Sequence, residues 1–344
     1  MSTLAQIRGG ILEEIILILL ENAGYRILDE SDGEKIRKGS NGLELQGRGE
    51  WHQVDALVAY DFSPSFIYPI RLIVETKAYL PKSRNRGRIG IDVIRNAVGV
   101  LKDVNENFFS YSSHSKNNEY KFSRFNYVYS VFSLCGFTKN AQRYAIAHQI
   151  FLFQYHFNPL FEDIKNLIFQ VDNWELFTKK NFELAELRRI IRDYLQNKSS
   201  VKDNLFTDKG KQMIRKLKEE LDKIKGSYFG LLNGEYPIHL VSEKPLNQIQ
   251  ADEILSEIHI NKARYVTLEF NNNKLYFELP EVIAKVFLKI WSDKVKIAKT
   301  KKEYISYITL TGKIEGIRRS LVIKLDKNWL DEYLKNIINN KEAF

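Results

Sequence analysis

The stretch Arg-Leu-Ile-Val-Glu-Thr-Lys at residues 71–77 decides how this chain is interpreted. Its apolar centre predicts a buried β-strand, and alternate residues of a strand point to the same face. Glu75 and Lys77 should therefore project side by side from a mostly hydrophobic element, where a charge is costly without a purpose. Asp55 belongs to a second strand-like stretch, 51–60, which would pair with the first as a hairpin. We expect the three side chains to converge.

Two carboxylates and an amine at one point are the minimal set for holding a divalent cation and preparing a water to attack a phosphodiester. Mg²⁺ (or Mn²⁺) prefers oxygen ligands and keeps several waters, so Asp55 and Glu75 would suffice as ligands. Lys77 would orient or deprotonate the attacking water, or stabilise the transition state. The ordinary alternative is a solvated face for Glu-x-Lys and a turn residue for Asp55.

Composition predicts an ordered globular protein with room for two domains. The chain has 344 residues, of which 44% are hydrophobic and only 7 are Pro. Its formal charge of +9 makes an anionic partner plausible. A single cysteine, Cys135, excludes an internal disulfide and fits a reducing compartment, so we expect a cytoplasmic protein. The apolar run 15–20 is too short to span a bilayer, so we expect no membrane association.

The first half of the chain alternates helical and strand-like patterns. Gly24 should stop the first helix. The expected elements are a helix at 11–23, strands at 25–28, 51–60 and 68–78, a helix at 92–104, a strand at 127–134, a helix at 139–148 and a strand at 150–155. This order predicts an α/β fold with an α-β-β-β-α-β core.

The second half changes character. We expect amphipathic helices at 182–195 and 211–225 around a polar linker, a hairpin of strands 265–270 and 274–279, and a strand pair at 304–311 and 319–325. The predicted division is a first domain at 1–160, a helical region at 161–235, and a C-terminal α+β domain at 236–344.

Residues 47–55, Gly-Arg-Gly-Glu-Trp-His-Gln-Val-Asp, followed by Val-Glu-Thr-Lys at 74–77, resemble the PD-(D/E)XK nuclease superfamily, and within it the Mrr-like restriction endonucleases. The helix that starts near Leu12 and the stretch 136–150 are similar to the branch's opening helix and late strand–helix–strand. Together these pieces cover about residues 4–155. Val54 replaces the superfamily's proline, and Gln53-Val54-Asp55 replaces the Gly-Ile-Asp often seen in the branch. The resemblance implies a restriction-endonuclease-like core and a metal-dependent DNA nuclease centred on Asp55, Glu75 and Lys77.

The resemblance also implies that a glutamate of the first helix faces the site. We prefer Glu13, which lies on the edge of the buried face, because Glu14 neighbours Glu21 and should face solvent. His52 and Gln53 are expected to contact the substrate or a metal-bound water. The alternative for His52 is a turn residue with a local hydrogen bond.

Two basic segments could bind phosphates. The first is the loop that begins five residues after Lys77 and contains Lys82, Arg84, Arg86 and Arg88. The second is the lysine-rich stretch 285–302, which holds Trp291 and could help to bind DNA. Both could equally be solvated, solubilising surface.

The leading functional prediction is a Mg²⁺-dependent DNA endonuclease of restriction or phage-defence type. The alternatives are a DNA-repair or junction nuclease on the same fold, and a non-catalytic DNA-binding or effector-sensing protein on a nuclease scaffold. DNA is the expected partner. A homodimer is expected from chemistry, because cutting both strands usually requires two sites.

Overall fold

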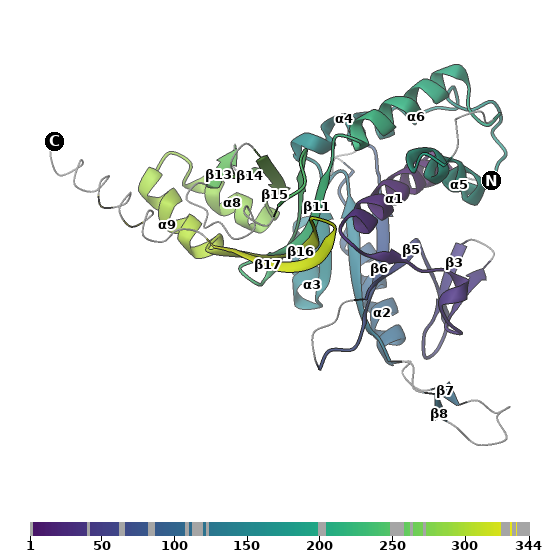
Figure 1. The fold of residues 1–344 in the computed structure, drawn as a ribbon, viewed down its shortest axis with the longest axis horizontal. Helices are drawn as coiled ribbons and strands as arrows, with labels where there is room; N and C mark the ends of the chain where they lie inside the picture. Colours follow the sequence, from purple (N-terminus) through teal and green to yellow (C-terminus); the bar gives the residue numbers. More distant parts are fainter. Residues whose placement is uncertain are drawn as a thin grey trace. The chain divides into compact units, whose positions relative to one another are not determined.

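The computed structural model describes residues 3–39, 42–61, 66–81, 87–106, 110–111, 120–121, 124–198, 204–247, 258–261, 264–270, 273–324, 331 and 335. The chain divides into two compact units, residues 1–154 with 165–218 and residues 155–164 with 219–344. The helical region predicted at 161–235 is thus shared between the units. No helix among the described residues has the length and apolar character needed to cross a membrane. The structure is mixed α/β, as predicted (Figure 1).

The first unit is built on a five-stranded mixed sheet. Its order is β1 (Arg26–Ile27), β5 (Ala56–Tyr60), β6 (Ile70–Lys77), β9 (Asn126–Ser133) and β10 (Ile150–Gln154). The first three strands pair antiparallel, and β6, β9 and β10 pair parallel. The predicted strands at 68–78, 127–134 and 150–155 are confirmed. Strand β6 therefore lies at the middle of the sheet, which explains its apolar sequence.

Helix α1 (Leu4–Asn22) packs on one face of this sheet. The Thr3 side chain and Gln6 form a capping box at its start, and Gly24, with φ +99°, follows its end. The hydroxyl of Thr76 donates to the carbonyl of Gly9, 3.1 Å away, so α1 lies on the face of β6 that carries Thr76. Adjacent strand residues face opposite ways, so Ile73 and Glu75 face the other side.

Helices α2 (Ile91–Glu106) and α3 (Lys139–Ala147) cover that other face. Their buried residues form one core with Leu57, Ile73 and Tyr129 of the sheet, and the helices predicted at 92–104 and 139–148 are confirmed. The same core includes a small antiparallel sheet of β2 (Ile36–Gly39), β3 (Gly42–Gln46) and β4 (Trp51–Val54).

The small sheet corrects the interpretation of residues 51–60 as one strand. Strand β4 belongs to the three-stranded sheet and β5 to the five-stranded sheet, and the chain bends at Asp55 between them. The polar stretch 29–42, for which the sequence predicted no element, contains η1 (Glu30–Asp32) and β2. A hairpin of β7 (Ser110–Tyr111) and β8 (Tyr120–Lys121) follows α2.

Three further helices follow β10: α4 (Glu162–Phe169), α5 (Leu184–Leu195) and α6 (Asp208–Leu221). Helix α5 belongs to the first unit and packs against α1. Its buried residues are Leu187, Ile190, Ile191 and Leu195, the stripe expected of an amphipathic helix.

The second unit holds a seven-stranded antiparallel sheet in the order β13-β14-β15-β12-β11-β16-β17. Its strands are β11 (Gly226–Leu232), β12 (Tyr236–Ser242), β13 (Ile258–Asn261), β14 (Tyr265–Phe270), β15 (Asn273–Glu278), β16 (Tyr307–Ile314) and β17 (Ile317–Lys324). Helices α8 (Glu281–Lys289) and α9 (Lys294–Tyr304) accompany them. The predicted hairpin β14–β15 and strand pair β16–β17 are confirmed.

The segment 155–164, with the turn η2 (Pro159–Phe161), is anchored in this unit by His239. The two ring nitrogens of His239 are hydrogen-bonded to Tyr155 Oη at 2.7 Å and to Ser227 Oγ at 2.9 Å. Phe229 stacks on the ring with centroids 4.0 Å apart. All four side chains are buried, so the imidazole is enclosed by aromatic groups and satisfied by two hydroxyls.

Candidate functional site

Asp55 lies where the chain passes from the small sheet to the large one. Ala56 of β5 pairs with Val74 of β6 in the antiparallel register. The residue before Ala56, Asp55, therefore lies beside the residue after Val74, Glu75. The backbone N–H of Thr76 donates to Asp55 Oδ2 at 2.8 Å, and the Thr76 hydroxyl lies 3.4 Å from the same oxygen. The Asp55 carboxylate is therefore fixed by the very strand that carries Glu75 and Lys77.

Glu75 and Lys77 point to the same side of β6, as the spacing predicts. The Nζ atom of Lys77 is 2.8 Å from Glu75 Oε1, and the Tyr129 hydroxyl donates to Glu75 Oε2 at 2.5 Å. Tyr129 is on the neighbouring strand β9, where it pairs with Ile73. We call Asp55, Glu75, Lys77 and Tyr129 the Asp55 cluster. Its three predicted members are brought together, and Tyr129 is an addition.

Burial governs the electrostatics of the cluster. It raises the pKa of Asp55, although the Lys77 charge and the Thr76 N–H oppose the rise. Burial acts to lower the pKa of Lys77, but the charges of Glu75 and Asp55 outweigh it and the pKa is raised overall. Lys77 is thus an ammonium in this arrangement.

Glu13 of α1 lies near the cluster. It is buried and accepts a hydrogen bond from Arg188 of α5. Burial raises the pKa of Glu13 well above its usual range, Arg188 opposes the rise, and the charge of Asp55 adds to it. Glu13 is therefore within electrostatic reach of Asp55.

The expectation that Glu14 faces solvent is wrong. Glu14 is fully buried, and it accepts hydrogen bonds from Arg188 Nε at 2.9 Å and from Arg192 Nε at 2.6 Å. The reason is that α5 covers this side of α1 and supplies two cations to balance the buried charges. The sequence around α1 alone gave no sign of that cover.

His52 and Gln53 lie on β4 and outside the Asp55 cluster. His52 Nε2 is 2.7 Å from Asp103 Oδ2 of α2, and the N–H of Gly49 donates to Asp103 Oδ1. His52 is thus a strand residue whose partner lies 51 positions away on α2, which differs from the alternative of a turn residue with a local hydrogen bond. Gln53 is exposed and pairs with Glu44 on β3. A substrate contact by either residue stays a prediction.

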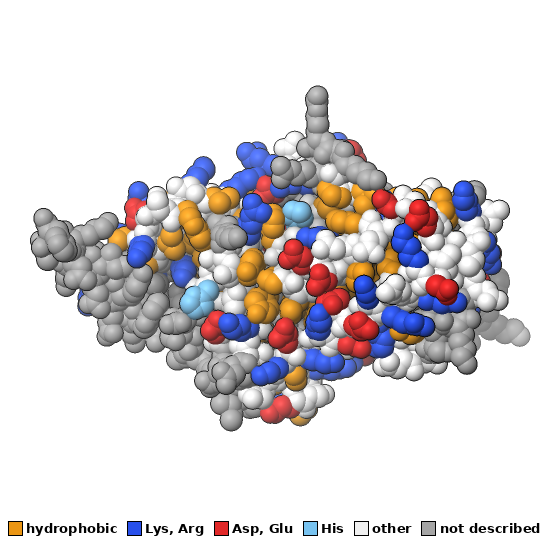
Figure 2. All heavy atoms as spheres, turned by 90° about the horizontal axis from the view of Figure 1, so that it is seen from above, with side chains coloured by type: hydrophobic (Ala, Val, Ile, Leu, Met, Phe, Trp, Pro, Cys, Tyr) orange, Lys and Arg blue, Asp and Glu red, His pale blue; other side chains and the backbone are white. Residues whose placement is uncertain are grey.

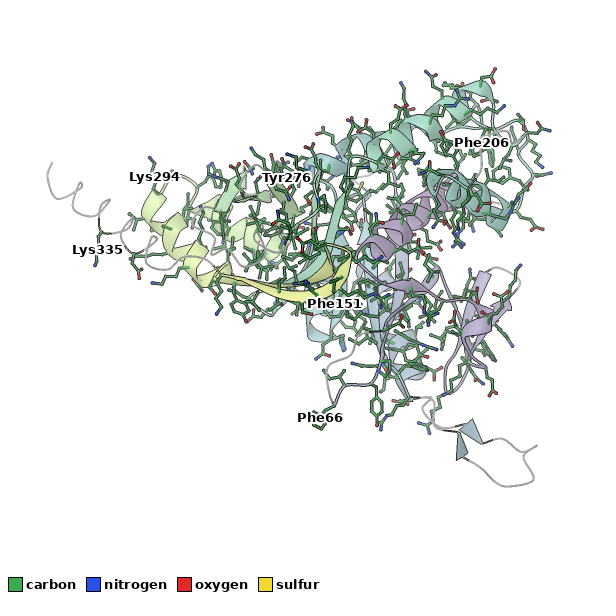
Figure 3. All side chains as sticks on the ribbon, viewed as in Figure 1. Phe66, Phe151, Phe206, Tyr276, Lys294 and Lys335 are labelled. Carbon is green, nitrogen blue, oxygen red and sulfur yellow. The ribbon has the colours of Figure 1, made fainter. Side chains whose placement is uncertain are left out.

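Only part of the two basic segments lies among the described residues. Lys82, Arg84 and Arg86 lie outside the described residues, and Arg88 is half-buried. In the second unit, α9 begins at Lys294, which is labelled in Figure 3, and the nearby Trp291 is 43% exposed. Figure 2 shows a face on which cationic side chains are interspersed with acidic ones. DNA binding by these segments stays a prediction.

Two residues near the site were missed from the sequence. The signal for Tyr129 was a side chain with a polar tip in the middle of a strand that pairs with β6. The signal for Arg188 was its spacing of four from Arg192 at the edge of an apolar stripe, which puts both cations on one helix face.

The donor set fits a small hard cation. Among the residues that the structure describes, no three His, Cys, Asp or Glu side chains gather at metal-binding distance. The carboxylates of Asp55 and Glu75 lie on neighbouring chain segments and influence each other electrostatically. Mg²⁺ commonly takes one or two carboxylates and several waters. The raised pKa of Asp55 reflects a buried negative charge that a divalent cation would compensate.

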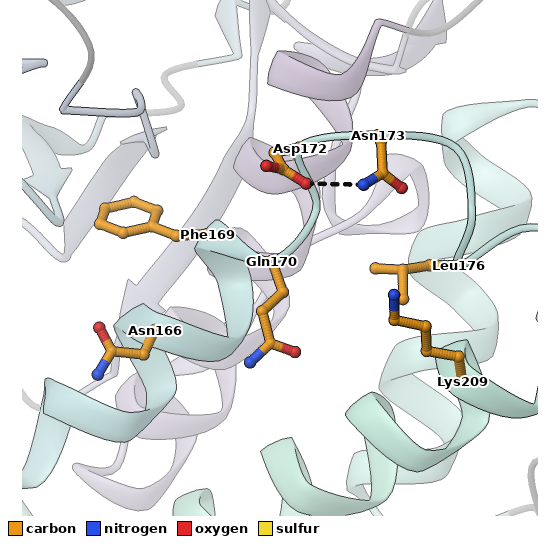
Figure 4. Close-up of a pocket in the computed structure, with 7 residues that line it drawn as sticks. All are labelled: Asn166, Phe169, Gln170, Asp172, Asn173, Leu176 and Lys209. Carbon is orange, nitrogen blue, oxygen red and sulfur yellow. Dashed lines mark hydrogen bonds between the residues drawn. The ribbon is translucent and has the colours of Figure 1, made fainter.

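A pocket elsewhere in the first unit involves none of these residues. It is lined by Asn166, Phe169, Gln170, Asp172, Asn173, Leu176 and Lys209, from α4, the loop after it and α6 (Figure 4). Asn173 donates to Asp172 across its rim at 3.1 Å. This pocket and the Asp55 cluster are therefore separate sites.

Comparison with known proteins gives little further guidance. No protein family and no curated protein matches the sequence. Among solved structures, the crystal structure of a protein of unknown function, AF1548, is similar over 62% of this chain and 97% of its own, with 15% identity and a TM-score of 0.33. At this TM-score the likeness does not define a shared fold.

Proposed function

We propose that this protein is a Mg²⁺-dependent DNA endonuclease with a restriction-endonuclease-like core. One observation carries the proposal. Asp55, at the bend before β5, comes together with Glu75 and Lys77 of β6: Lys77 Nζ is 2.8 Å from Glu75, and the Thr76 amide holds Asp55. The order α1, β1, β5, β6, α2 and β9 supports the α-β-β-β-α-β core.

Asp55 and Glu75 would hold the metal, which when bound neutralises charge on the phosphoryl oxygens and supplies an activated water. The Thr76 amide fixes the direction of Asp55, and the Tyr129 hydroxyl fixes that of Glu75. Lys77 would orient or deprotonate the attacking water, or stabilise the developing negative charge of the scissile phosphate. These positions are set by the strands before any substrate binds.

Plasmid cleavage in Mg²⁺ or Mn²⁺ tests the proposal. We expect the wild-type chain to nick or linearise DNA, and Asp55→Asn and Lys77→Ala each to lose at least about a hundredfold in rate. Asp92→Asn is the matched control, because its carboxylate is 91% exposed on α2. Circular dichroism should show that all variants fold. Cutting that survives both cluster variants, or DNA binding without cutting by the wild type in either metal, would remove the assignment.

Substrate choice then separates restriction or phage defence from repair. We expect duplex DNA, unmethylated or methylated, to be cut in preference to branched or single-stranded DNA. Preference for junctions would instead indicate a repair nuclease. Sedimentation with uncleavable duplex in Ca²⁺ should reveal a dimer, and monomers with and without DNA would count against paired cutting of both strands.

A further inference from the structure

Helix α5 brings an arginine to the edge of the candidate site from outside the segment that carries the motif. Arg188 Nη2 donates to Glu13 Oε1, and its Nε donates to Glu14 Oε1 at 2.9 Å. The Arg188 side chain is 20% exposed, whereas those of Glu13 and Glu14 are 5% and 0% exposed. Both contacts are long-range in the sequence, because Arg188 lies 175 positions after Glu13 and 174 positions after Glu14.

Gly10 leaves room for this approach. A Cβ atom at Gly10 would lie 3.1 Å from Leu184 Cδ1 and 3.3 Å from Arg188 Cγ, so a side chain there would crowd the stem of Arg188. A Cβ at Gly9 would lie 3.9 Å from the carbonyl of Thr76 on β6. Helix α1 is therefore packed closely between β6 and α5.

Both arginines donate to Glu14, but they differ in their contact to Glu13. Arg192 gives Glu14 two hydrogen bonds, at 2.6 Å and 2.9 Å, and no contact joins Arg192 to Glu13 among the described hydrogen bonds and ion pairs. Arg188 is the cation that holds Glu13. A buried carboxylate without a cation takes up a proton or turns away. Arg192 thus offers a control that shares helix, charge and network but not the contact to Glu13.

We propose that Arg188 is a positioning residue for the metal site: its guanidinium fixes the Glu13 carboxylate within electrostatic reach of Asp55, which makes α5 a working part of the site. The proposal rests on the proposed function. Residues that orient metal-binding carboxylates typically change metal affinity by 10- to 100-fold when removed. We therefore expect Arg188 to affect metal binding itself, and not only the docking of α5 on α1.

Isothermal titration of the full chain with Mn²⁺ alone, without DNA, tests this. We expect Arg188→Met to weaken Mn²⁺ binding about tenfold or more, Arg188→Lys to recover most of that loss, and Arg192→Met to stay within about twofold of wild type. Glu13→Gln should weaken binding comparably, and adding Arg188→Met to it should have little further effect, because both changes act on one contact.

Each result decides between distinct explanations. Equal Mn²⁺ affinity in Arg188→Met and wild type would show that Arg188 only docks α5 on α1. Tighter Mn²⁺ binding by Arg188→Met would show that the arginine competes with the metal. Either overturns the inference and leaves the nuclease proposal standing. Absence of Mn²⁺ binding by the wild type overturns both. Should Arg188→Met fail to fold, Glu13→Gln tests the same contact, and a Mn²⁺ affinity equal to that of wild type in Glu13→Gln would also refute the inference.

Discussion

Acid should weaken the second unit through His239. Burial lowers the pKa of His239 to about 3, against 6.5 for an ordinary histidine. Below pH 6.5 the unfolded chain gains a proton on this residue, while the folded chain does not until about pH 3. The stabilisation is therefore complete above pH 6.5 and is lost as the pH falls toward 3. At 1.36 kcal/mol per pH unit, the full loss is roughly 5 kcal/mol, and about 3 kcal/mol is lost by pH 4.

Hydrogen exchange of β11 and β12, followed by mass spectrometry at pH 7 and pH 4 and corrected for intrinsic rates, measures the loss locally. His239→Gln removes the titrating group. Between pH 7 and pH 4, the free energy of opening should therefore fall by about 3 kcal/mol more in wild type than in the His239→Gln variant. His259→Gln is the control, because His259 is exposed on β13 in the same unit. An equal acid response in wild type and His239→Gln would refute the reasoning.

Three further outcomes are expected. Tyr129→Phe removes the hydrogen bond to Glu75 and should slow single-turnover cleavage about tenfold with the fold unchanged; an unchanged rate would leave Tyr129 without a role. Glu14→Gln removes the buried carboxylate of Arg192 and one of the two carboxylates of Arg188, and should cost about 3 kcal/mol in urea unfolding; a cost below about 1 kcal/mol would contradict the pairing. Because burial raises the pKa of Asp55 and a metal binds the ionised form, Mn²⁺ affinity should be full above that raised pKa and fall below it. Titrations from pH 4 to 8 should therefore place the fall above the ordinary aspartate value of about 3.9, and a fall at or below it would disagree.

The sequence was most informative where periodicity and local pairing decide structure. The apolar run in β6 predicted a buried strand, and the spacing of Glu75 and Lys77 predicted their shared face. Asp55 could be placed beside them because consecutive strands with a short connection usually pair. The same reasoning could not detect the bend at Asp55, since residues 51–60 look like one continuous strand and the polar residues before them hide β2 and β3.

The contacts of α1 were beyond such reasoning. Glu13 and Glu14 occupy adjacent helix positions, and only the packing of α5 on both explains why both are buried. Nothing in local pattern joins Arg188 to Glu13, because the contact depends on how the chain returns after β10. His239 was missed for the same reason: its partner Tyr155 lies 84 residues earlier.

The route of the chain between its two units affects how the protein can be made and cut. Residues 155–164 belong to the second unit, but 165–218 return to the first before the rest of the second unit follows. During synthesis at ~5–20 residues per second, Tyr155 and Phe161 would wait on the order of ten seconds for β11 and β12 to emerge. Truncation near residue 160 would remove α5 from the first unit. A single proteolytic nick there would cut the covalent link between Tyr155 and the rest of the second unit.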